Sequence, residues 1–326
     1  MNLRMGATPP SSRPLKAEPP RHVIAAPTLL GLAAILLWST TLPVARSLAE
    51  QIGALTAAAC VNGIGGLLLL ILSWMRRTKE RGTFSRRYLG ICGGLYVLYF
   101  ALLHAGLGMA TTRHQALEVG LMNYLWPSLT LLLAVPILGM PARWQLLLPG
   151  IAIAPLGVGM VLTSSTELTL AGFLSGVATC PHPYLLGTLA ALAWALFSNL
   201  SRRLTQRATG SAISWFMLAT GIVLWAMQRL FAETHLWTGR TVVEIAAMAL
   251  ISTTGYAFWD VAMRRGDIAL VATFSYFTPL LSTLFGSFYL QVSPHPRLWW
   301  GCALIILAAL ICRLATQPRD DLGAVE

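Results

Sequence analysis

Aromatic side chains lie deep inside several long apolar stretches of this 326-residue sequence. On a helix, residues three or four apart point to the same side, so Tyr96 and Tyr99 share one face and Tyr256 and Trp259 share another. Such rings can hold an apolar group or, through cation–π attraction, an organic cation. Ordinary packing of the rings is the alternative. The rings predicted to bind a ligand are Trp38, Tyr96, Tyr99, Trp126, Trp194, Tyr256, Trp259 and Tyr276.

A proline interrupts two of these apolar stretches, which read NYLWP at 123–127 and SYFTP at 275–279. Pro127 and Pro279 each remove one backbone hydrogen bond and clash with the carbonyl four residues earlier. Each is expected to kink a helix, and the freed carbonyl should face protein or a wet cavity. The alternative is that the polar side chains nearby only bond helix to helix. The polar residues predicted to bind the ligand at these kinks are Asn123, Ser275 and Thr278.

The elements that must position these residues are transmembrane helices. The chain is 56% hydrophobic and 11% charged, with a mean hydropathy of +0.67, whereas a soluble domain carries roughly 25% charged residues. A bilayer core needs about 20 apolar residues per helix, and runs such as LLLLIL (67–72) lack the alternation of a barrel strand. The fold class predicted is an all-α polytopic membrane protein. Its ten helices are expected near 25–44, 53–74, 88–109, 116–139, 144–163, 183–201, 210–230, 242–263, 268–290 and 298–315.

The basic residues predict the orientation of the chain. If the amino terminus is cytoplasmic, the inside segments hold 18 of the 23 Lys and Arg residues, as the positive-inside rule requires. Both termini are then cytoplasmic. Topology accounts for the net charge of +11 without a nucleic-acid partner.

Three pairs of segments match in the same order. LLGLAAILLW (29–38) aligns with LLGTLAALAW (185–194), GLYVLYFALLHAG (94–106) with GYAFWDVAMRRG (255–266), and NYLWPSLTLL (123–132) with SYFTPLLSTL (275–284). The chain is therefore predicted to be two five-helix repeats, 25–163 and 183–315. Because five is odd, the second repeat is inverted, which is typical of secondary transporters with a central cavity. The remaining segments are predicted to be cytoplasmic tails, 1–24 and 316–326, and an extracytoplasmic connecting loop, 164–182.

Asp260 and Glu118 are the deepest carboxylates of the predicted helices, and an intramembrane acid suggests a functional site. Asp260 is predicted to hold a substrate ammonium or a coupling proton. The alternative is neutralisation by Arg264, one turn later. Glu118 is the second candidate for proton coupling, with contact to water or a pair with Arg113 as the alternative.

The paired repeats, each with a Leu-Leu-Gly…Trp start and a Tyr-x-x-Pro fourth helix, resemble the EamA-type repeats of the drug/metabolite transporter superfamily over about residues 25–315. Within that superfamily, HQALEVGLMNYLWPSLT (114–130) and TELTLAGFLSG (166–176) resemble the YddG-type amino acid exporters. The resemblance implies ten helices around a central cavity. It also implies export of aromatic or other amino acids across the bacterial inner membrane, by alternating access.

Several alternatives stay open. The solute could be another metabolite or a cationic drug, and a channel could replace a carrier. Proton antiport and facilitated diffusion are both compatible with the acids. No HExxH or GxSxG occurs and the five cysteines form no CxxC pair, so no enzyme, metal site or cofactor is predicted. The GxxxG in GICGG (90–94) can pack helices within one bundle or between chains, so a monomer is expected and a weak dimer is the alternative.

Overall fold

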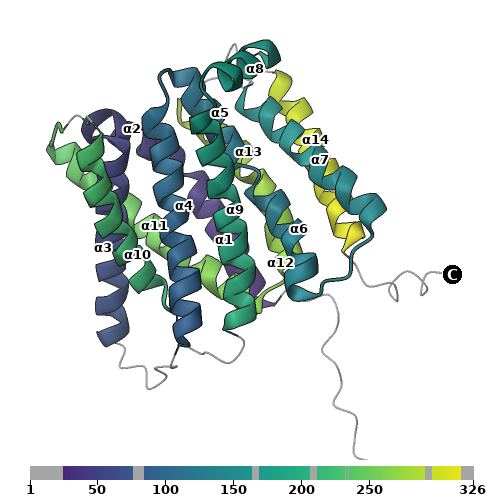
Figure 1. The fold of residues 1–326 in the computed structure, drawn as a ribbon, viewed down its shortest axis with the longest axis horizontal. Helices are drawn as coiled ribbons and strands as arrows, with labels where there is room; N and C mark the ends of the chain where they lie inside the picture. Colours follow the sequence, from purple (N-terminus) through teal and green to yellow (C-terminus); the bar gives the residue numbers. More distant parts are fainter. Residues whose placement is uncertain are drawn as a thin grey trace, which may run out of the picture.

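The computed structural model describes residues 25–75, 84–163, 169–205, 211–231, 233, 235–290 and 296–316. Within these ranges every regular element is a helix. Nine helical stretches of the described chain are long and apolar enough to cross a membrane, and a bent pair supplies a tenth. Figure 1 shows them side by side in one bundle. The predicted all-α, polytopic fold is confirmed.

The helices of the two halves follow one another along the chain with a short helix between them. The first half contains α1 (Ala26–Ser39), α2 (Thr41–Ile52), α3 (Ala54–Met75), α4 (Arg86–Met109), α5 (Arg113–Asn123), α6 (Trp126–Leu138) and α7 (Trp144–Leu162). The second contains α9 (Pro181–Leu204), α10 (Ile213–Met227), η1 (Gln228–Leu230), α11 (Gly239–Arg265), α12 (Ile268–Phe274), η2 (Ser275–Phe277), α13 (Thr278–Leu290) and α14 (Pro296–Ala315).

The segment between the halves, expected to be a loop over 164–182, is partly helical. It forms α8 (Leu170–Thr179), which lies at the edge of the bundle in Figure 1. Thr169 begins this helix, and its side chain accepts a hydrogen bond from the backbone N–H of Gly172. A helix of ten residues is too short to cross a bilayer, so α8 does not change the number of spans. Residues 164–168 lie outside the described residues.

Helices of one half have their largest contacts with helices of the other half. α3 packs on α10, α7 on α14, α1 on α11 and α4 on α9. The α1–α11 pair joins the first span of one half to the third span of the other, and α4–α9 joins the same two spans with the halves exchanged. A two-fold axis between inverted repeats requires this exchange. The tertiary contacts therefore agree with the repeat read from the sequence.

Glycines permit the close approach of the two helix pairs that unite equivalent spans. A Cβ on Gly301 of α14 would lie 2.8 Å from the carbonyl oxygen of Gly157 of α7, and a Cβ on Gly157 would lie 3.0 Å from that of Gly301. The α3–α10 pair repeats the arrangement, since a Cβ on Gly221 would lie 2.8 Å from the backbone nitrogen of Gly63. Helices in lipid associate through such backbone contacts, because lipid tails offer no hydrophobic driving force.

Replacing Gly301 with alanine should therefore separate α7 from α14. The added methyl group meets the backbone of α7 at Gly157 and Val161, so we expect the free energy of unfolding to fall by about 1–3 kcal/mol. The Tm of the detergent-solubilised protein measures the change. Gly90→Ala is the matched control, because a Cβ there meets nothing within 4 Å and alanine favours a helix by up to about 1 kcal/mol. Equal Tm values for the two variants would contradict the packing argument.

Both fourth spans are interrupted just before their prolines. α5 ends at Asn123 and α6 begins at Trp126, so Pro127 is the second residue of α6. Pro279 is the second residue of α13, which follows the 3₁₀ turn η2. Each interrupted span remains long and apolar enough to cross a membrane, over His114–Leu138 and Ile268–Phe285. The interruptions predicted from Pro127 and Pro279 are therefore present.

The first span differs from the single helix expected over 25–44. α1 ends at Ser39, and the chain bends by 49° before continuing as α2. Pro43 has no N–H to donate to the carbonyl of Ser39, and the hydroxyls of Thr40 and Thr41 donate instead to the carbonyls of Leu37 (2.8 Å) and Trp38 (2.7 Å). The equivalent helix of the other half, α9, contains no proline between Tyr184 and Leu204 and is unbroken over 24 residues.

Candidate functional site

The predicted ligand-binding rings meet between the two halves of the bundle. Trp194 of α9 lies at the centre of this group, with seven rings at centroid distances of 4.7 to 6.4 Å. We call the group the ring cluster. Its members are Trp38 of α1, Tyr96, Tyr99 and Phe100 of α4, Trp126 of α6, Trp194 and Phe197 of α9, Phe216 of α10, and Tyr256 and Trp259 of α11.

The exchanged helix pairs bring these rings together. Because α1 packs on α11 and α4 on α9, the aromatic faces read along each helix are directed to one another. Gly255 lets the Trp38 indole approach α11, since a Cβ at Gly255 would lie 2.5 Å from Trp38 Nε1. Tyr96 and Trp259 are fully buried as a result, with 0% and 1% of their surface exposed.

Polar atoms inside the ring cluster lack protein partners. Trp38 Nε1 and the Tyr96 hydroxyl are buried without a hydrogen bond to the described part of the protein, and so is Oδ1 of Asn123, which adjoins Tyr99. By contrast, Trp259 Nε1 donates to Ser198 Oγ at 3.4 Å. A buried polar group without a partner costs about 1–3 kcal/mol, and buried polar groups in folded proteins are normally hydrogen-bonded. The ring cluster thus presents donors and acceptors suited to water or to a solute.

Three predicted residues lie elsewhere. Tyr276 is buried in a separate core between α6, α7 and α14, where its hydroxyl lies 2.6 Å from Ser128 Oγ. The hydroxyls of Ser275 and Thr278 donate within their own span, to the carbonyls of Ala272 (2.6 Å) and Ser275 (2.8 Å). Hydroxyls near an interrupted helix commonly bond the backbone in this way. The structure therefore does not bring Ser275, Tyr276 and Thr278 into the ring cluster.

Asp260 is paired with Arg264, which is the structural alternative considered from the sequence. Asp260 Oδ2 accepts from Arg264 Nη2 at 2.8 Å and from Ser211 Oγ at 2.7 Å. Both side chains of the pair are buried, with 1% and 5% of their surface exposed. Asp260 lies one residue beyond Trp259, so the pair sits beside the ring cluster.

Glu118 is remote from the ring cluster. It is buried and accepts a hydrogen bond of 2.5 Å from the hydroxyl of Tyr184, whose own ring contacts Phe173 of α8. Gly176 of α8 lies over this pair, because a Cβ there would meet the Tyr184 hydroxyl. The alternative pairing with Arg113 falls on a side chain outside the described ones.

Three phenylalanines of the ring cluster were not among the residues predicted to bind the ligand, although Phe100 shares the aromatic face of Tyr96 and Tyr99. Phe100, Phe197 and Phe216 have no polar group to single them out. A helical spacing signal was nevertheless present, since Phe100 follows Tyr96 by four residues and Phe197 follows Trp194 by three. Phe216 carries no such signal, because α10 packs on the cluster from a separate part of the chain.

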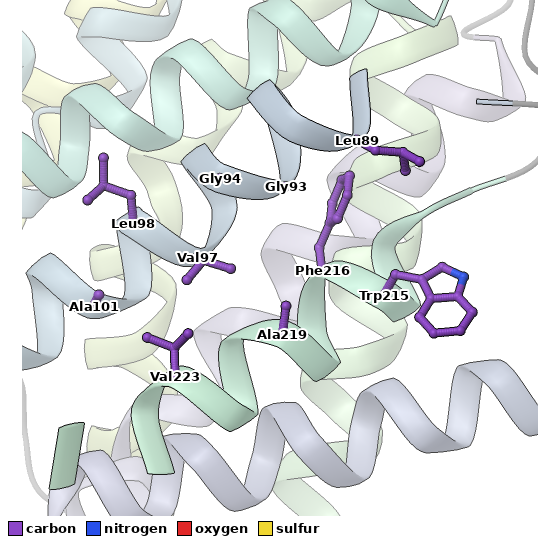
Figure 2. A pocket seen from close by; sticks show the side chains of 10 residues that line it. All are labelled: Leu89, Gly93, Gly94, Val97, Leu98, Ala101, Trp215, Phe216, Ala219 and Val223. Atoms are coloured by element: carbon purple, nitrogen blue, oxygen red, sulfur yellow. The ribbon is translucent and has the colours of Figure 1, made fainter. Parts of the chain in front are cut away.

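An apolar groove lies between α4 and α10, as Figure 2 shows. It has a volume of about 750 Å³. Leu98 and Trp215 on its walls are 45% and 61% exposed, so it opens on the outer surface of the bundle, where lipid chains would lie. Its lining residues are Leu89, Gly93, Gly94, Val97, Leu98, Ala101, Trp215, Phe216, Ala219 and Val223.

Comparison with known proteins assigns the chain to a family. A sequence model described as the EamA-like transporter family matches residues 26–163 and, a second time, residues 182–314. The chain belongs to this family. The resemblance read from its repeats is thereby confirmed.

Curated relatives of this transporter are similar over nearly their whole length. The Aromatic amino acid exporter YddG of Salmonella typhimurium (strain 14028s / SGSC 2262) is 35% identical over 293 residues, covering 90% of this chain and 98% of the relative. The protein of the same name from Escherichia coli (strain K12) is 33% identical over 291 residues, covering 89% and 97%. A crystal structure superposes with a TM-score of 0.73 at 26% identity, covering 90% of this chain and 98% of that one.

Proposed function

We propose that this EamA-like transporter exports amino acids across the bacterial inner membrane. The names of its relatives support this function. The observation that carries it is the ring cluster, in which rings from both halves lie around the partnerless polar atoms of Trp38 and Tyr96. A largely apolar site with a few polar groups is typical of small-molecule binding. Aromatic amino acids offer a ring that can stack on the ring cluster. We propose aromatic amino acids as substrates, with other amino acids as a wider range.

Alternating access between the inverted halves is the proposed mechanism. The interruption before Pro127 lies in the span that contributes Trp126 to the ring cluster, and the α1–α2 bend begins one residue after Trp38. The interruption before Pro279 is the equivalent position in the other half. These breaks are the proposed hinges, because residues at helix ends can absorb backbone rotation.

In alternating access, the contacts that join the two halves at one face of the bundle must break when the binding site opens to that face. On the face opposite the chain ends, Glu244 of α11 accepts hydrogen bonds of 2.8 Å from both Ser47 and Gln51 of α2. Glu233, which precedes α11, accepts from the backbone N–H groups of Leu55 (2.7 Å) and Thr56 (2.9 Å) at the start of α3. We propose that these carboxylates close that face while the ring cluster is packed.

The proposed orientation has both termini in the cytoplasm. Four arginines lie in the last turns of helices that end on the face of the chain ends, Arg202 and Arg203 in α9 and Arg264 and Arg265 in α11. Cations at a helix carboxyl end are also favoured by the helix dipole, and their excess on one face agrees with the positive-inside rule.

Counterflow in proteoliposomes tests the proposed function. Vesicles that contain the protein and are loaded with unlabelled phenylalanine should take up labelled phenylalanine faster than protein-free vesicles. The uptake should saturate, because a carrier offers one site per cycle. Uptake that rises linearly with concentration and is not stimulated by internal substrate would favour a channel. No uptake of any labelled amino acid, with transport of a cationic drug, would replace the proposed substrate class.

A further inference from the structure

A layer of polar side chains lies one helix turn from the ring cluster. On three helices, a polar residue lies four positions before or after a member of the ring cluster, which is about 6 Å along a helix. Given the direction of each helix, all three steps lead toward the face where α1 begins and α14 ends. The steps run from Tyr96 to Cys92 on α4, from Phe197 to Ser201 on α9, and from Tyr256 to Asp260 on α11. We call Tyr88, Cys92, Ser201, Asp260 and Arg264 the polar layer.

Three atoms of the polar layer are buried without an oxygen or nitrogen hydrogen-bond partner in the described structure. They are Asp260 Oδ1, the Tyr88 hydroxyl and Ser201 Oγ. Their residues expose 1%, 0% and 1% of their surface. The other oxygen of Asp260 is fully engaged, by Arg264 and Ser211. A buried carboxylate oxygen with no donor is costly, because its lost hydration is not replaced.

These groups surround one region of the interior. Asp260, Arg264 and Cys92 lie near Tyr88, and the Cys92 thiol is a hydrogen-bonding neighbour of the Ser201 side chain. A thiol is only a weak hydrogen-bonding group, so Cys92 does not satisfy its polar neighbours. The Tyr88 ring packs on Phe216 of the ring cluster at 5.5 Å, which places the polar layer directly against the rings.

The chemistry of the partnerless atoms matches both ends of a zwitterion. Asp260 Oδ1 accepts hydrogen bonds, as an ammonium requires, and the hydroxyls of Tyr88 and Ser201 can donate to a carboxylate. We infer that the polar layer binds the α-ammonium and α-carboxylate of the transported amino acid, while its side chain occupies the ring cluster. This inference rests on the proposed function and names the recognition of the main-chain groups.

Charge balance then selects the substrate. Asp260 and Arg264 form a neutral pair, so a zwitterion adds no net charge to the buried site. An amine without a carboxylate, or an acid without an amine, brings an uncompensated charge into a medium of low dielectric constant, which is strongly unfavourable. The site is therefore selective for net-neutral amino acids over cationic drugs.

Removal of the two hydroxyls tests the inference. In the Tyr88→Phe/Ser201→Ala variant, the KM for phenylalanine counterflow should rise by at least about tenfold, because hydrogen bonds to a charged group are lost. The Tm without substrate should stay within about 2 °C of that of the wild type, since the Tyr88 hydroxyl has no protein partner to lose and the Ser201 hydroxyl has only the weak thiol of Cys92. Thr253→Val is the matched control, because it also removes a buried hydroxyl that has no partner. Thr253 lies on α11 beside Gly65 of α3, and the KM of this variant should not change.

Competition gives a second readout that protein stability does not affect. Against labelled phenylalanine, phenethylamine and 3-phenylpropionate should each compete at least about tenfold more weakly than phenylalanine in the wild type. In the double variant the preference for phenylalanine over phenethylamine should shrink, because the groups that hold the carboxylate are gone. Ser201→Ala alone gives the same comparison if the double variant does not fold.

The outcomes separate the two proposals. A wild type that shows no amino acid counterflow overturns the proposed function. A wild type that transports phenylalanine, with an unchanged KM in the double variant or equal competition by phenethylamine, overturns the polar layer as the site for the main-chain groups and leaves the export function standing.

Discussion

Arg264→Ala is expected to lower the free energy of unfolding by about 3–5 kcal/mol, because it leaves the Asp260 carboxylate buried and unpaired. The two side chains are separated by 2.8 Å and are almost entirely inaccessible to solvent, so water cannot replace the guanidinium. Thermal unfolding in detergent, followed by tryptophan fluorescence, measures the loss. The effect should be the largest of any single arginine replacement in α11.

The neighbouring arginine provides the control. Arg265 is exposed, and Arg265→Ala should change the stability by less than about 1 kcal/mol. Asp260→Leu combined with Arg264→Met should recover much of the stability, since replacement of a buried pair by apolar side chains is often neutral. Transport should remain impaired in that double variant if Asp260 binds the substrate. Equal destabilisation by Arg264→Ala and Arg265→Ala would show that the buried pair contributes nothing.

Trp194→Ala is expected to have the second large effect, on both stability and transport. Trp194 is 3% exposed and contacts seven other rings, so its truncation leaves a cavity at the junction of the halves. Such truncations cost about 3–5 kcal/mol. Because the same rings form the proposed side-chain site, phenylalanine counterflow should fall by more than about tenfold.

A tryptophan on the outside of the bundle separates these effects from a general loss of aromatic surface. Trp215 of α10 is 61% exposed on the outer surface, and Trp215→Ala should preserve counterflow within about twofold of the wild type. Trp194→Phe keeps a ring in the cluster and should retain more stability than Trp194→Ala. A stable Trp194→Ala protein with wild-type counterflow would rule out the ring cluster as the side-chain site.

The inverted duplication was predicted from the sequence and can be compared with the tertiary contacts. The colinear matches at 29–38, 94–106 and 123–132 predicted two five-span repeats, and odd span number alone implied their inversion. The contacts of α1 with α11 and of α4 with α9 have the exchange that a two-fold axis demands. Sequence symmetry did not extend to side-chain roles, however, since Trp126 joins the ring cluster and its counterpart Thr278 bonds its own helix.

Departures from the sequence prediction have local causes. The bend after Ser39 was not predicted because a hydropathy pattern does not register the missing N–H of one proline, here Pro43. α8 was missed because ten apolar residues are too few for a span and were assigned to a loop. The sequence identified Asp260 as an acid within a helix. It did not distinguish between a ligand-binding carboxylate and one neutralised by Arg264, and the side-chain geometry shows the pair with Arg264.

By itself the sequence determined the membrane environment, the number of spans, the inverted repeat and the rings Trp38, Tyr96, Trp194 and Trp259, because hydropathy and helical spacing are local properties of the chain. Only the tertiary structure decided which of those rings meet, that Tyr276 and Glu118 lie elsewhere, and that Tyr88, Ser201 and Asp260 are buried close to the rings. These facts depend on contacts between residues that are far apart in the sequence. Such contacts are set by how the two halves pack and leave no periodic signal in either half.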